Sequence, residues 1–194
     1  MVIFKIVRHS NGGHQYMENM LSYILDDRRL DIGFNGISCY GTNQEIVHKA
    51  MEEMLFVKKY FGKVSGNPLI QFVVSYDSNV SNVIIASSIT KEIARFLADS
   101  YQYIWVVHYK PREEESGFYA CYHAHIVINS VSYTNGKMYS ESPENIRSFA
   151  QYIANVTGAN VKIECSYEKS DGSMSTYHDN KCIYPASHIY SGLL

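Results

Sequence analysis

Hydrophobic residues recur along the chain with two different spacings, which predict alternating strands and helices. Short apolar runs that end at polar residues or glycine are typical of strands, and apolar residues three or four positions apart are typical of helices. The predicted strands cover residues 2–7, 34–40, 68–75, 103–109 and 118–129. The predicted helices cover residues 16–25, 42–60, 84–99 and 143–158.

A predicted hairpin decides the fold class. Residues 131–139 form a further extended run after the last predicted strand, and this run contains the dipeptide Asn135-Gly136, a strong hairpin signal. A hairpin requires antiparallel pairing, so we expect an α/β (α+β) fold with a largely antiparallel central sheet and helices packed on it. We predict one domain over residues 1–160 and a polar C-terminal extension over residues 161–194 that packs on the same domain.

Composition excludes several classes of protein. The chain has 194 residues, of which 46% are hydrophobic and 19% charged, as in globular proteins. Its net charge of -2 excludes a strongly basic coat protein for nucleic acid, but not an enzyme with positive charge confined to one groove. No apolar run approaches the roughly 20 residues that span a bilayer, and the first run is too short for a signal peptide. We therefore predict a cytoplasmic protein whose four cysteines, which include no C-x-x-C pair, are reduced thiols.

Three histidines form the main chemical signal. His123 and His125 are two residues apart on a predicted strand, so their imidazoles project from the same face of the sheet. His108 lies near the end of the preceding predicted strand and can join them if the two strands are neighbours. Three imidazoles around one ion leave coordination positions open for a substrate, as a catalytic metal site requires. The sequence therefore predicts a metal site, although an incidental histidine pair is the common alternative.

The same histidines carry a resemblance to a known family. The segment with His108, the run 123–129 and the Gly-Lys dipeptide at 136–137 resembles the third motif of the mobilisation relaxases of plasmids and conjugative elements. These proteins are single-strand DNA endonucleases of the HUH superfamily. Tyr23, in a Tyr-Ile pair on an early predicted helix, is similar to the family's first motif, and Ser75, at the end of an apolar strand, is similar to its second motif.

The resemblance implies an enzyme that nicks one DNA strand at an origin of transfer. Tyr23 would be the nucleophile that forms a religatable 5′-phosphotyrosyl intermediate, and His108, His123 and His125 would bind Mg²⁺ or Mn²⁺. Ser75 would contact the scissile phosphate or orient the tyrosine. Accessory DNA-binding proteins and a coupling protein would be partners, as in the family.

Further residues are candidates for DNA contacts, each with a plainer alternative. We predict DNA contacts for Arg28 and Arg29, which follow Tyr23 but would also suit a solvated helix end, and for Asn129 and Lys137, which belong to the third motif. Many relatives carry an acidic residue shortly after the first histidine. Here Tyr109 and Lys110 occupy those positions, and three glutamates, Glu113, Glu114 and Glu115, come later in the loop.

Alternatives remain at this stage. Tyr16, seven residues before Tyr23 on the same helix face, is either a second nucleophile or a core aromatic. A rolling-circle replication initiator would share the chemistry of a relaxase. A noncatalytic DNA-binding relative would keep the fold alone, and a metal-dependent hydrolase of small phosphoesters would not need Tyr23.

Overall fold

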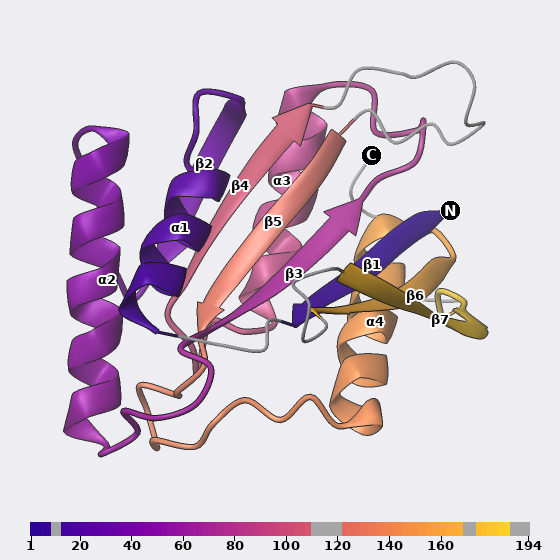
Figure 1. Cartoon of the computed structure of the whole chain (residues 1–194). Helices are drawn as coiled ribbons and strands as arrows, with labels where there is room; N and C mark the ends of the chain where they lie inside the picture. The colour runs from indigo at the N-terminus through magenta and orange to yellow at the C-terminus, as the bar shows by residue number, and fades with distance from the viewer. Residues whose placement is uncertain (9–12, 110–121, 169–173, 187–194) are drawn as a thin grey trace.

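A computed structural model describes residues 1–8, 13–109, 122–168 and 174–186 of the chain. Its elements, in chain order, are β1 (Val2–Arg8), α1 (His14–Ile24), β2 (Arg29–Asn35), α2 (Asn43–Tyr60), β3 (Leu69–Ser75), α3 (Val83–Arg95), β4 (Tyr103–Tyr109), β5 (Tyr122–Asn129), α4 (Pro143–Thr157), β6 (Val161–Glu168) and β7 (Met174–Ile183). The strands form a seven-stranded sheet in the order β2-β4-β5-β3-β1-β6-β7 (Figure 1). Every pairing is antiparallel except the one between β1 and β6, which confirms the predicted fold class.

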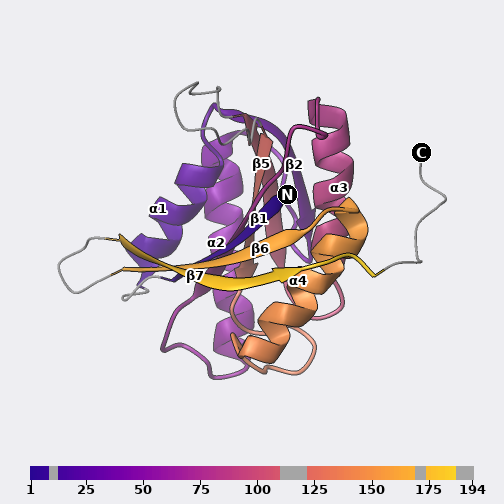
Figure 2. The same cartoon turned by 90° about the vertical axis from the view of Figure 1, so that its right-hand side faces the viewer.

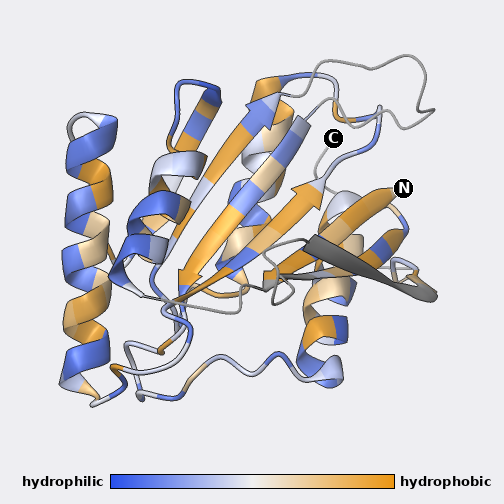
Figure 3. Cartoon of the chain, in the orientation of Figure 1, coloured by the Kyte–Doolittle hydropathy of each residue, from blue (hydrophilic) through white to orange (hydrophobic). Residues whose placement is uncertain are grey.

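Helices cover both faces of the sheet. Figure 2 shows α1 and α2 on one side and α3 and α4 on the other. One apolar core lies between the sheet and α3 and α4 and includes Phe72 and Phe149. A second core, which includes Leu21, Met54 and Val106, lies beneath α1 and α2. Because β4 and β5 are buried on both faces, their ribbons are mostly orange in Figure 3, and β5 turns blue only toward its first residues.

Local capping signals fix where two of the helices begin. The Thr42 side chain accepts a hydrogen bond from the Glu45 backbone N–H, and the Glu45 carboxylate accepts one from the Thr42 N–H, at the start of α2. At the start of α4 the Ser142 side chain accepts a hydrogen bond from the Asn145 N–H, and Pro143, whose fixed φ suits the first helical turn, follows it. α4 ends before Gly158, which has a left-handed φ of 63°. Both predicted helix starts are confirmed.

The predicted hairpin is wrong in its extent. Asn135-Gly136 lies in a tight turn, in which the Ser132 N–H donates to the Lys137 carbonyl, but Val131 and Met138 form only an isolated bridge. β5 pairs instead with β4 on one side and β3 on the other. Because β3 and β4 occupy both edges of β5, residues 131–139 cannot pair with β5 as the second strand of a hairpin.

The remaining differences concern the strands at the edges of the sheet. β2 spans Arg29–Asn35, several residues before the predicted strand at 34–40. β6 and β7, which the sequence did not place, complete the sheet beyond β1. Within the described residues, no helix has the length and apolar composition needed to cross a bilayer.

Gly33 allows β2 to pack beneath a tryptophan. Gly33 lies opposite Trp105 of β4, and a Cβ atom at Gly33 would lie 2.4 to 2.6 Å from three atoms of the Trp105 indole ring. We expect Gly33→Ala to lower the free energy of unfolding by about 2–3 kcal/mol, which thermal unfolding would show as a fall in Tm of roughly 4–10 °C. Gly13→Ala, where a Cβ would meet nothing within 4 Å, is the control. Equal shifts for the two variants would contradict the steric explanation.

Candidate active site

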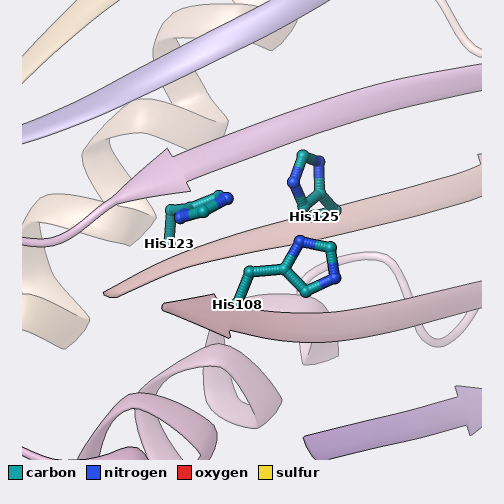
Figure 4. Close-up of side chains that lie close together, drawn as sticks. All are labelled: His108, His123 and His125. Carbon is teal, nitrogen blue, oxygen red and sulfur yellow. The ribbon is translucent and has the colours of Figure 1, made fainter. Parts of the chain in front are cut away.

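Three histidines meet at one end of the sheet, where β4 ends and β5 begins. In the antiparallel register His123 lies opposite His108 on β4, and His125 lies opposite Val106. The three rings therefore lie on the same face of the sheet, the face that α1 covers (Figure 4). One ring nitrogen from each histidine lies within 4.8 Å of the others. The predicted convergence of His108, His123 and His125 is confirmed.

The end of α1 orients His108. The last carbonyls of a helix lack partners within the helix, and the Ile24 carbonyl accepts a hydrogen bond of 3.0 Å from His108 Nε2. A carbonyl can only accept, so Nε2 carries the proton and Nδ1 keeps its lone pair. Burial lowers the pKa of His108, although the bond to Ile24 and the carboxylate of Asp26 act in the opposite direction. The ring is therefore neutral at pH 7, as a metal ligand must be.

His125 is the most deeply buried of the three imidazoles. Its side chain is 4% exposed, and burial, followed by the neighbouring His123 and His108, lowers its pKa to about 3. Its Nδ1 forms a hydrogen bond of 2.8 Å with the Gln71 side-chain amide. Its Nε2 is buried and has no hydrogen-bond partner among the described residues. A buried nitrogen without a partner is costly unless it serves another purpose, and metal ligation is such a purpose.

Tyr23 lies next to this cluster, near the end of α1. Its ring packs edge-on against His125, with 5.7 Å between the ring centroids, and the side chain remains 50% exposed. The guanidinium of Arg28 lies over the Tyr23 ring, 5.5 Å from its centroid, and donates a hydrogen bond of 2.6 Å to Asp26. Arg28 thus contacts the Tyr23 ring while its side chain stays largely exposed. The arrangement holds an accessible phenol beside three imidazoles.

Ser75 and Arg29 also lie on the histidine face. Ser75, the last residue of β3, is directly opposite His123 in the register and is partly buried. Arg29, the first residue of β2, is opposite His108, and its Nη1 atom is buried with no hydrogen-bond partner among the described residues. Both side chains place a hydrogen-bond donor beside the cluster. Their roles in catalysis and DNA binding stay predictions.

Two predicted DNA contacts lie away from the cluster. Asn129 is six residues beyond His123 on β5, about 20 Å at the rise of an extended strand, and is fully buried. Its amide donates to the Met54 carbonyl and to the Gln102 side chain, so in this structure the residue joins β5 to α2. Its DNA contact stays a prediction. Lys137 is exposed in the loop after β5, at the same distant end of the sheet. Residues 113–115, the candidate glutamates, lie outside the described residues.

Two residues at the site were not found from the sequence. Gln71 contacts His125, and its only sequence signal is a polar residue within an apolar strand. Asp26 follows Tyr23 by three residues, and its carboxylate raises the pKa of His108. Its own pKa is lowered, chiefly by the hydrogen bond from Arg28, so Asp26 is ionised at pH 7. Asp26 thus supplies negative charge near His108.

The donor set fits a divalent cation. Because Nε2 of His108 donates to a carbonyl, its Nδ1 carries a lone pair, and the unpartnered Nε2 of His125 carries one in the tautomer that has the proton on Nδ1. The ligand atoms of the three histidines are close enough for one ion to reach them. Three histidine ligands leave further coordination positions open, which is characteristic of catalytic sites. The residues present therefore could hold one metal ion.

Comparison with known families agrees with this geometry. The family model described as "Relaxase: MobA/VirD2-like, nuclease domain" matches residues 23–159, which is more than half of the chain and includes Tyr23 and all three histidines. Searches of curated proteins and of solved structures gave no match. The chain belongs to the relaxases, in the family of MobA/VirD2-like nuclease domains.

Proposed function

We propose that this relaxase nicks single-stranded DNA at an origin of transfer and becomes joined to it through Tyr23. The observation that carries the proposal is the position of Tyr23. The phenol is half exposed, it is 5.7 Å from the His125 ring by centroid, and it belongs to the helix whose last carbonyl binds His108. A small-phosphoester hydrolase that used water would have no need for this phenol.

The proposed step is a transesterification. The Tyr23 oxygen attacks the scissile phosphorus, a new phosphorus–oxygen bond forms, and the bond from phosphorus to the 3′ oxygen breaks. The phenolic proton is lost to solvent and the departing 3′ oxygen gains one, so a 5′-phosphotyrosine and a free 3′-hydroxyl result. Because one phosphodiester replaces another, the strand can be rejoined by the reverse step.

The surrounding residues would position and stabilise the reacting groups. His108, His123 and His125 would hold a divalent ion, Mg²⁺ or Mn²⁺, which when bound supplies electrophilic stabilisation of the phosphate. Ser75 would donate a hydrogen bond to the phosphate from beside His123. The guanidinium of Arg28 lies over the Tyr23 ring and would restrict the rotation of the ring. The hydrogen bond from Arg28 to Asp26 would hold the guanidinium in this position.

A denaturing gel tests the proposed chemistry. Single-stranded oligonucleotides that tile both strands of the element's own DNA are incubated with the full chain and Mn²⁺, with a label at either the 3′ or the 5′ end. A 5′-phosphotyrosyl link requires the 3′ label to migrate with the protein and the 5′ label to be released on a shorter strand. Cleavage without any covalent adduct would overturn the proposal, and so would binding without cleavage.

Arg29 is proposed to contact a DNA phosphate, because its buried Nη1 has no partner among the described residues and the residue is opposite His108 in the strand register. We expect Arg29→Gln to weaken single-strand binding roughly tenfold and to reduce the slope of log affinity against log salt by about 0.7, the loss of one phosphate contact. Fluorescence anisotropy over a salt series measures both.

Arg147, exposed on α4, provides the matched control. It lies on the helix layer that packs on the other face of the sheet. Arg147→Gln should leave the affinity and the salt slope unchanged. A salt slope that is the same in Arg29→Gln and in the wild type would contradict the phosphate contact.

A further inference from the structure

Gln71 is a buried amide in an otherwise apolar part of β3. Its side chain is 5% exposed within the run Leu-Ile-Gln-Phe-Val-Val. Burying an amide without a partner costs about 1–3 kcal/mol, so the position calls for a specific contact. That contact is His125 Nδ1, at 2.8 Å.

The register explains how Gln71 reaches His125. Val73 is directly opposite His125, and Gln71 lies two residues along β3 on the same face, which makes it a diagonal neighbour. The Gln71 amide on β3 therefore contacts the Nδ1 edge of the His125 ring. The Nε2 atom on the other side of the ring remains buried, without a hydrogen-bond partner among the described residues.

The two nitrogens of a neutral imidazole are linked, because a proton on one leaves a lone pair on the other. In the structure the amide nitrogen faces His125 Nδ1, an arrangement that matches a proton on Nε2. A half-turn of the amide would present its oxygen instead. Nδ1 would then donate, and Nε2 would carry the lone pair that a metal ligand needs.

We propose that Gln71 is the positioning residue for the His125 ligand, and that its amide oxygen, turned toward Nδ1, holds the tautomer in which Nε2 binds a divalent cation. This inference rests on the metal site of the proposed function. Gln71 would thus do for His125 what the Ile24 backbone carbonyl does for His108, which is to accept the proton of one ring nitrogen. A carbonyl only accepts, so it fixes one tautomer, whereas the amide allows both.

Three variants separate this role from simple packing. Gln71→Met has a similar volume but cannot accept a proton from Nδ1, so we expect the affinity for Mn²⁺ to fall 10–100-fold, as for other lost partners of ligating histidines. Gln71→Glu can only accept, so its affinity should equal or exceed that of the wild type. Gln102→Met removes another buried amide, 4% exposed and bonded to Gly36 and Asn129, and should leave Mn²⁺ affinity unchanged.

Isothermal titration of the full chain with Mn²⁺ alone, without DNA, measures these affinities. Long-range ¹H–¹⁵N NMR of the metal-free protein reports which nitrogen of His125 is protonated, and Gln71→Glu should show the proton on Nδ1. Wild-type affinity in Gln71→Met would overturn the inference while leaving the metal site intact. Absence of Mn²⁺ binding by the wild type would overturn the metal site, and the inference with it.

A folding defect in Gln71→Met would not block the test. The NMR comparison between the wild type and Gln71→Glu then decides, because it needs neither the methionine variant nor bound metal. A His125 ring that keeps its proton on Nε2 in Gln71→Glu would overturn the inference.

Discussion

Tyr23→Phe is expected to abolish the covalent adduct with DNA and to reduce strand cleavage at least about a thousandfold, as the loss of a nucleophile does in other enzymes. Phenylalanine keeps the ring that packs against His125 but lacks the attacking oxygen. Because Tyr23 is half exposed, the substitution should change neither Tm nor Mn²⁺ affinity. Denaturing gels with 3′-labelled DNA measure the adduct, and titration measures the metal.

Tyr16→Phe is the matched control on the same helix. Tyr16 packs against the apolar core beneath α1 and α2, as a core aromatic does. We expect its variant to form the adduct at the wild-type rate. Cleavage that survives in Tyr23→Phe would indicate a water nucleophile, and an adduct that survives there but disappears in the double variant would assign the chemistry to Tyr16.

The central strands were predictable because they are apolar on both faces. β3 and β4 occupy nearly the predicted residues, and β5 reaches its predicted end. β2 was misplaced because it is an edge strand that contains Asp31 and Gly33, residue types that are depleted in strands. Its position depends on pairing with β4 and on Trp105 covering Gly33, which are tertiary contacts that no local pattern records.

The candidate site was predictable only as far as strand periodicity reaches. A spacing of two residues placed His123 and His125 on one face, and the order of strands made His108 their neighbour. Asn129 was a candidate because of the resemblance to the third motif, not because of strand periodicity, and it lies in a buried junction with α2. Gln71 reaches the site by a diagonal contact between β3 and β5, whose pairing the sequence did not predict.

His125→Ala is expected to remove metal binding and to lower metal-dependent cleavage at least about a hundredfold. A cation that binds only the folded chain stabilises it by about 2.7 kcal/mol at one hundred times its Kd, which for a chain of this length raises Tm by roughly 5–10 °C. Mn²⁺ should therefore raise the Tm of the wild type but not that of His125→Ala. The comparison is made within each variant, with and without Mn²⁺, so that the cavity left by the missing ring cancels.

His48→Ala separates the cluster from histidines in general. His48 is exposed on α2, outside the three-histidine site, so its variant should keep both the Mn²⁺-dependent rise in Tm and the cleavage activity. An equal rise in all three proteins would show that Mn²⁺ binds elsewhere on the chain. Loss of the rise in His125→Ala alone, together with loss of cleavage, would show that the metal binds at the imidazoles that Tyr23 faces. The rise in Tm reports metal binding through stability and cleavage reports it through activity, so the two measurements are independent.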